Sequence, residues 1–64
     1  MIDLLHLLHV GDKLYSPICG ECKVIALDSE EIYCITVQTP YKGRFDFDKY
    51  GRFALNGEVL LFMI

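Results

Sequence analysis

The stretch that decides the fold class is residues 41–58, which read YKGRFDFDKYGRFALNGE. Within it, Phe45 and Phe47 alternate with charged residues, and glycine-containing turns follow at Gly51 and Gly57. Alternation with a period of two residues, closed by glycine turns, is typical of strands that bury one face. The sequence therefore predicts a small, mainly β domain with antiparallel strands.

The size and composition of the chain favour a single domain that works with its surface. The chain has 64 residues, of which 53% are hydrophobic, and its mean hydropathy is +0.33. At this length folding buries only about 60% of the surface of the extended chain. Some apolar side chains must therefore stay exposed or meet another molecule. We expect one domain spanning residues 1–64, and either a protein partner or a homo-oligomer.

The remaining pattern predicts five short strands preceded by a helix. The expected strands are residues 13–15, 22–27, 31–39, 44–47 and 59–63. In so short a chain they would most simply bend into one barrel, because closure removes exposed sheet edges. Residues 2–9 predict a two-turn amphipathic helix, with four leucines on one side and Asp3, His6 and His9 on the other. We thus expect an N-terminal helix in residues 1–10 and a barrel in residues 11–64.

Several short segments resemble known proteins. Residues 11–17, GDKLYSP, together with Gly20-Glu21 and Val24-Ile25, resemble the opening of small SH3-like barrels of the Tudor and KOW types. This resemblance implies a five-stranded SH3-like antiparallel barrel, a fold whose members bind proline-rich peptides, modified side chains, RNA, DNA or polymerases. Residues 14–17, 20–22, 51–52, 57–58 and 61–62 also look like a group of short uncharacterised proteins of bacteria and their phages. That second likeness suggests a phage-related role.

One stretch interleaves aromatic and basic residues. Residues 41–53 hold four basic residues against two acidic ones, a local net charge of +2 in a chain whose net charge is −3. The candidate binding surface consists of Tyr15, Tyr41, Lys42, Arg44, Tyr50 and Arg52. Tyrosines would give a protein partner apolar contact area, and the cations would fix its register. We therefore expect a non-enzymatic adaptor that binds a protein.

The same surface suits an alternative ligand, nucleic acid. Aromatic rings can stack on bases while lysine and arginine contact phosphates. The negative net charge of the whole chain weighs against indiscriminate binding to a phosphate backbone. A third interpretation is a solvated strand with loops whose aromatic rings cover the edge of the core.

The cysteines raise the question of a metal or redox site. Cys19 and Cys22 form a C-x-x-C turn, and His6 and His9 could complete a zinc site. A second C-x-x-C or comparable pair is absent, which favours a hairpin in which the cysteines pack as small apolar residues. A redox dithiol usually lies at a helix N-terminus, whereas strands flank this one. Cys34 is expected in the core, and we expect neither a metal nor a cofactor.

Catalytic and targeting signals are also missing from the sequence. Asp46 and Asp48 lie side by side on one strand rather than across a cleft, as paired catalytic carboxylates would. Neither a Ser-His-Asp order, a phosphate loop nor an HExxH helix occurs, so we do not expect an enzyme. A secretory signal and an apolar run of about 18 residues are absent, which predicts no membrane association. Together with the odd number of cysteines, this favours the cytoplasm.

Overall fold

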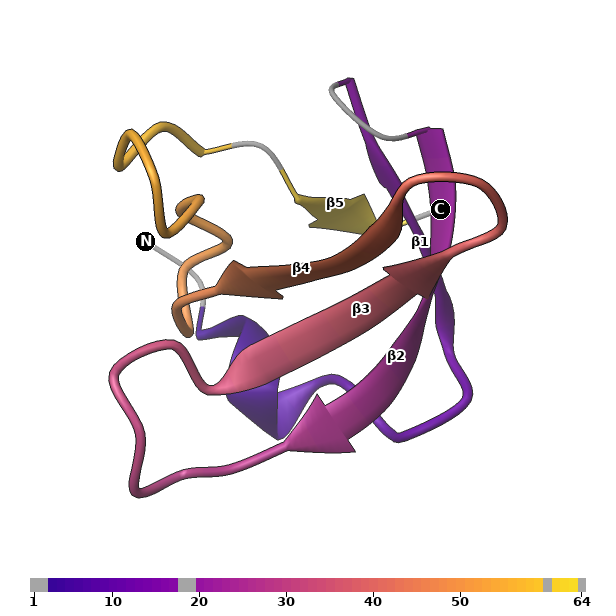
Figure 1. Ribbon diagram of the computed structural model, residues 1–64. Coiled ribbons are helices and arrows are strands. Elements are labelled where there is room, and N and C mark those ends of the chain that lie inside the picture. The colour runs from indigo at the N-terminus through magenta and orange to yellow at the C-terminus, as the bar shows by residue number, and fades with distance from the viewer. Residues whose placement is uncertain (1–2, 18–19, 60, 64) are drawn as a thin grey trace.

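The computed structural model describes residues 3–17, 20–59 and 61–63, and these form a mainly β structure (Figure 1). Its elements are a short 3-10 helix η1 (Leu4–His6) and the strands β1 (Lys13–Ser16), β2 (Gly20–Leu27), β3 (Ile35–Thr39), β4 (Gly43–Phe47) and β5 (Phe62–Met63). The strands pair antiparallel in one sheet with the order β4-β3-β2-β1-β5. The prediction of a mainly β, antiparallel domain is confirmed.

The sheet is open between β4 and β5 in the described residues. Strands β1 to β4 follow one another as hairpin neighbours, and β5 returns to pair with β1 through only two residue pairs. Along the connection from β4 to β5, isolated bridges join Phe47 to Phe53 and Arg52 to Val59. The expected closed five-stranded barrel is therefore not confirmed, since the bridges do not extend into a ladder between β4 and β5.

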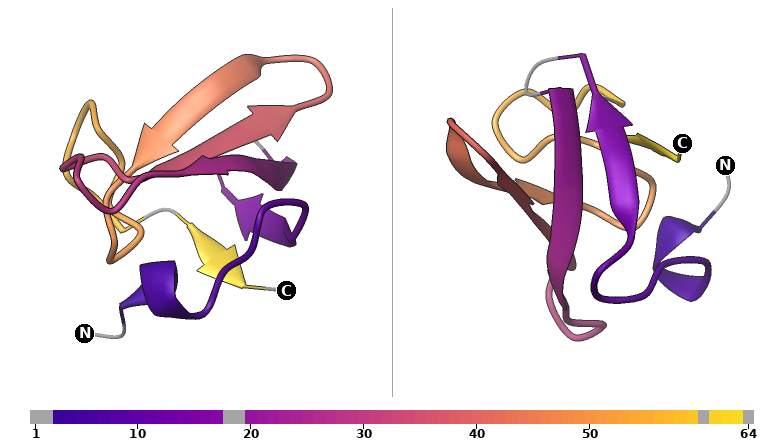
Figure 2. Two further views of the ribbon diagram at one scale, coloured as in Figure 1. Left: turned by 90° about the horizontal axis from the view of Figure 1, so that it is seen from below. Right: turned by 90° about the vertical axis from the view of Figure 1, so that its right-hand side faces the viewer.

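The core lies on the inner face of this curved sheet. Figure 2 shows β5 and the N-terminal segment facing β3 and β4 across the interior. The buried apolar residues are Leu8, Leu14, Cys22, Val24, Cys34, Ile35, Val37, Phe47, Phe53 and Leu61. The phenylalanine alternation behaves as predicted, because Phe47 is fully buried, Phe45 is half-buried, and Arg44 and Asp46 point to solvent. One core thus draws on residues from both ends of the chain.

The N-terminal segment differs from the expected two-turn helix over residues 2–9. A single 3-10 turn forms at Leu4–His6, capped by Asp3, whose Oδ1 accepts a hydrogen bond from the Leu5 N–H at 3.0 Å. Leu8 is buried, whereas Leu7 is exposed instead of facing inward. Helices this short are not stable by themselves, and the Leu4 N–H donates to the Lys49 carbonyl at 2.7 Å, which ties the segment to the body of the protein. Among the described residues, no helix has the length and apolar character needed to cross a membrane.

Two strands are shorter than the sequence predicted. Residues 31–33 form a bend rather than the start of the strand expected at 31–39, and Ile32 is 80% exposed. Asp28 stabilises this loop, because its side chain accepts a hydrogen bond from the Glu30 N–H and its backbone carbonyl accepts one from the Glu31 N–H. Its own N–H donates to the Cys34 carbonyl at 2.9 Å, so strand pairing resumes only at Ile35. The last strand, expected at 59–63, is reduced to Phe62–Met63.

Candidate functional site

The turn between β3 and β4 presents three of the predicted surface residues. Its loop, residues 40–42, is followed by Gly43 with a φ of +83°, the left-handed conformation that three-residue hairpin loops require. The buried hydroxyl of Thr39 accepts a hydrogen bond from the Lys42 N–H at 2.9 Å and donates one to the Gly43 carbonyl at 2.9 Å. The turn is therefore held from inside by a side chain of the strand that precedes it.

Tyr41 stands at the apex of this turn and is 96% exposed. Lys42 and Arg44 beside it are exposed as well, and we call these three residues the tip surface. The Arg44 Nε donates to the Gln38 Oε1 at 3.4 Å, which restrains the guanidinium against the neighbouring strand. An aromatic ring that packs against nothing yet sits on a braced turn is available for intermolecular contact.

Thr39→Val tests the bracing of the turn. The substitution keeps the shape of the side chain but removes both hydrogen bonds to the loop, so we expect a loss of about 1–3 kcal/mol in the free energy of unfolding. Urea unfolding followed by circular dichroism measures this loss. Thr36→Val is the matched control on the same strand. Its hydroxyl contacts the exposed Asp46 carboxylate at 3.0 Å, so we expect less than about 0.5 kcal/mol. Equal losses in the two variants would contradict the role of Thr39.

Tyr15 lies on the outward face of β1, at the same end of the sheet as the tip surface. It is half-exposed and stands opposite Glu21 on β2 and Phe62 on β5. The pairings of Ser16 with Gly20 and of Thr39 with Gly43 show that both hairpins turn at this end. The structure thus brings Tyr15 to the same end as the tip surface, although two strands separate them in the sheet.

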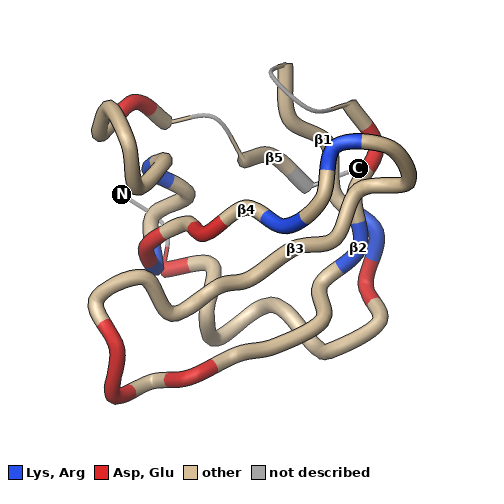
Figure 3. The backbone as a smooth tube through the Cα atoms, viewed as in Figure 1, with Lys and Arg blue, Asp and Glu red and all other residues tan. Residues whose placement is uncertain are grey.

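Tyr50 and Arg52 lie elsewhere, beyond the other end of β4. The Asp48 carboxylate accepts hydrogen bonds from both of their backbone N–H groups at 2.9 Å. Lys49 Nζ and Arg52 Cζ lie 5.2 and 5.3 Å from the centre of the Tyr50 ring, within range of cation–π attraction. The five residues of β4, about 13–16 Å of strand, lie between this cluster and the turn that carries Tyr41 and Lys42. Figure 3 shows the basic residues at the two ends of β4.

The sequence interpretation missed a set of residues that the strand register assembles on the outward face of the sheet. Lys13 pairs with Lys23, Lys23 with Gln38, and Gln38 with Arg44. Four adjacent strands therefore place three cations and one amide in a single line, which we call the outer row. Each lysine is an outward residue of its own strand, but nothing in the local sequence reveals that Lys13 and Lys23 face each other.

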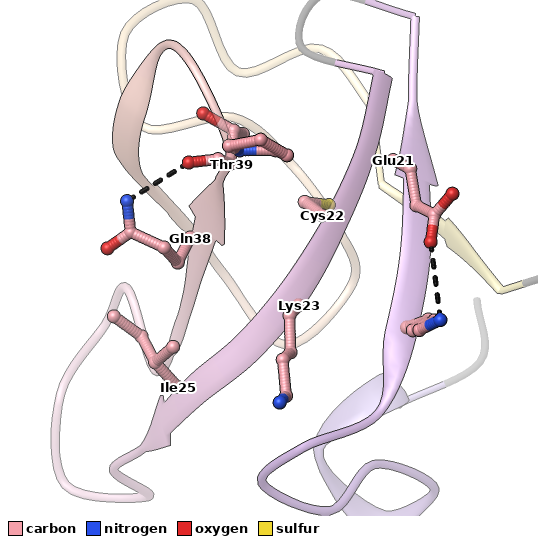
Figure 4. A pocket seen from close by; sticks show the side chains of 8 residues that line it. Glu21, Cys22, Lys23, Ile25, Gln38 and Thr39 are labelled. Atoms are coloured by element: carbon pink, nitrogen blue, oxygen red, sulfur yellow. Dashed lines mark hydrogen bonds and ion pairs between the residues drawn. The ribbon is translucent and has the colours of Figure 1, made fainter.

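A shallow groove runs along the outer row (Figure 4). Its volume is about 410 Å³, and its lining residues are Lys13, Glu21, Cys22, Lys23, Ile25, Gln38, Thr39 and Pro40. A β-bulge in β2 between Val24 and Ala26 interrupts the regular pairing there. Glu21 forms an ion pair with Lys13 at 3.7 Å. We call this depression the outer groove.

The structure tests the metal hypothesis only in part, because Cys19 lies outside the described residues. Cys22 is buried, and its Sγ lies 3.6 Å from the Leu14 carbonyl as a hydrogen-bond donor. His6 and His9 are exposed and lie within 3.5 and 3.9 Å of Asp3 and Asp12 respectively. Within the described ranges, no three potential ligands cluster as a metal site would require.

Cys34 is buried in the core, and Asp46 and Asp48 accept hydrogen bonds within the fold. Burial raises the pKa of the Cys34 thiol, which keeps it protonated and unreactive at neutral pH. The Asp46 carboxylate accepts a hydrogen bond from the Thr36 hydroxyl. Asp48 follows β4 instead of lying in it, and its carboxylate holds the turn that carries Tyr50.

The tip surface and the outer row together offer an exposed aromatic ring, positive charge and hydrogen-bond donors on paired strands. Exposed aromatic rings and cations of this kind are common in surfaces that bind other macromolecules. Comparison with protein-family models, with curated proteins and with solved structures finds no match to this chain.

Proposed function

We propose that the protein is a non-enzymatic binding module that contacts a protein partner through the tip surface, with Tyr15 at the same end of the sheet. The observation that carries the proposal is the position of Tyr41, which is 96% exposed at the apex of a turn braced by Thr39. A tyrosine offers a partner a large contact area and loses little conformational entropy on binding. Lys42 and Arg44 supply charge beside it.

We further propose that the scaffold is an SH3-like barrel. The strand order β4-β3-β2-β1-β5, in which the last strand returns to the first, supports this assignment. The bridges from Phe47 to Phe53 and from Arg52 to Val59 support closure, because they lead the chain from the free edge of β4 towards β5. A barrel would keep both sheet edges covered while the hairpin turns project outward.

Photo-crosslinking tests the tip surface directly. With p-benzoylphenylalanine in place of Tyr41, we expect a discrete protein crosslink in a lysate of the native host. Placing the same group at Leu55 is the matched control, since Leu55 is 86% exposed and lies in a different turn. The crosslink at position 41 should disappear when Lys42 and Arg44 are both replaced by alanine. Equal crosslinking at both positions, or none at position 41, would reject the proposal.

The outer row favours one competing function, nucleic-acid binding. Three cations aligned across four strands could follow a phosphate backbone. Fluorescence anisotropy with single-stranded and duplex oligonucleotides separates the two functions, because phosphate contacts make affinity fall steeply as salt concentration rises. Tight, salt-sensitive binding that Lys42→Ala with Arg44→Ala weakens would favour nucleic acid over a protein partner.

The protein partner is either a different protein or a second copy of this chain. Tyr15 and Phe62 are register partners on β1 and β5, and both are exposed. A second copy of the chain could bury this apolar area. Size-exclusion chromatography with light scattering distinguishes the two cases. A monomer at high concentration would assign the tip surface to a different protein.

A further inference from the structure

The outer row places like charges directly opposite each other. Lys13 and Lys23 are register partners on β1 and β2, an arrangement that destabilises a sheet. The carboxylate of Glu21 lies 3.7 Å from the Lys13 ammonium and offsets part of this repulsion. Within the part of the chain that the structure describes, Lys23 has no such carboxylate partner. A locally destabilising pair such as Lys13 and Lys23 is typical of a functional site, where residues are kept for binding at some cost in stability.

The chemistry of the outer groove combines these cations with apolar side chains. Figure 4 shows Lys23 between Glu21 on one side and Ile25 and Gln38 on the other. Pro40 adds a second apolar residue at the end nearest the tip surface. With neighbouring strands about 4.8 Å apart, the outer row extends about 14 Å from Lys13 to Arg44. The groove therefore suits an elongated, negatively charged ligand that also carries apolar groups.

We propose that the outer groove binds an acidic, extended peptide segment of the protein partner, an inference that rests on the proposed protein-binding function. Two carboxylates of the segment, on alternate residues and therefore on one face, contact Lys23 in the groove and Arg44, which follows Gln38 in the outer row just beyond the groove lining. Alternate side chains of an extended peptide lie about 6.8 Å apart on one face. Two strand spacings, about 9.5 Å, separate the Cα atoms of Lys23 and Arg44. This distance is longer than the spacing in the peptide, and the long, flexible side chains of lysine and arginine can bend towards each other to match it.

The lining of the groove favours a peptide over a nucleic acid. Binding of single strands depends on aromatic rings on which bases stack, and none of the eight lining residues is aromatic. The Glu21 carboxylate can accept hydrogen bonds from peptide N–H groups, which a sugar-phosphate backbone does not have.

Fluorescence anisotropy with a short fluorescein-labelled peptide of alternating glutamate and leucine tests the proposal. We expect Lys23→Gln to weaken binding about tenfold, the effect of losing one charge-assisted hydrogen bond. Lys49→Gln is the matched control, because it changes the net charge equally but lies at the other end of β4. We expect it to change the affinity less than about twofold. A peptide with glutamine in place of glutamate should not bind.

Several outcomes would overturn the proposal. These are no binding of the acidic peptide, equal weakening by Lys23→Gln and Lys49→Gln, or tighter binding of an oligodeoxythymidine than of the peptide. Circular dichroism of each variant shows whether the fold is intact. We expect Lys23→Gln to fold, because it removes the repulsion between Lys23 and Lys13.

If the acidic peptide fails to bind while the crosslink at position 41 persists, the groove proposal falls and the protein-binding function stands. If the peptide binds but no crosslink forms, the tip surface is not the contact site.

Discussion

We expect Gly51→Ala to destabilise the protein by about 2–4 kcal/mol, enough to unfold much of a domain of this size. Gly51 is buried and has a φ of +81°, a conformation that a residue with a Cβ adopts only at a cost. A Cβ at this position would also lie 2.9 Å from the Leu61 carbonyl oxygen and 3.2 Å from Leu4 Cδ1. The carbonyl belongs to the backbone leading into β5, so relieving the clash means moving the sheet edge.

Gly57→Ala separates the two contributions to this effect. Gly57 has a similar φ of +71°, but a Cβ there meets nothing within 4 Å. We expect it to lose only the conformational contribution, about 1–2 kcal/mol. Urea unfolding monitored by circular dichroism measures both variants under the same conditions. Equal losses would show that the close approach of Gly51 to Leu61 is unimportant for folding.

We expect Phe47→Ala to lose about 3–5 kcal/mol and to leave the chain largely unfolded at 25 °C. Phe47 is fully buried, and the centre of its ring lies 5.4 Å from that of Phe53. It pairs with Ile35 on β3 and bridges to Phe53 beyond β4. Removing the ring leaves a cavity at the point where the sheet meets the connection to β5.

Tyr41→Ala is the matched control for this variant, because it removes a ring of similar size that is 96% exposed. We expect a change in the free energy of unfolding of less than about 0.5 kcal/mol. Thermal and urea unfolding of the two variants should differ widely. A large loss in Tyr41→Ala would mean that its ring packs in solution, and the proposed role of the tip surface would then fail.

The strands and turns with strong local patterns were predictable. Phe45 and Phe47 alternate with charged residues, and residues 39–43 contain the proline and glycine of a tight hairpin. Because such turns depend on the backbone preferences of neighbouring residues, the exposed position of Tyr41 followed from the sequence. Ile32 and Leu7 were placed wrongly, because apolar composition alone does not reveal that a long turn or a single 3-10 turn leaves them in solvent.

The candidate surface was predictable only where its residues are close in the chain. Tyr41, Lys42 and Arg44 share one hairpin, so their grouping required no long-range pairing. Tyr50 and Arg52 are nearly as close in sequence, yet the length of β4 carries them to its other end. A cluster of basic residues in sequence therefore does not form one surface when a strand runs between them.

Hydrophobic alternation and turn residues, which act over a few neighbouring positions, were enough to predict short antiparallel strands and a loop at residues 41–43 with Tyr41 at the surface. The outer row was decided by the tertiary structure alone. Lys13, Lys23 and Arg44 come from three strands, and their alignment depends on a register set by packing of the opposite face, where Leu14, Val24 and Val37 are buried. Register is a property of paired strands, because a shift by one residue would turn every side chain to the other face.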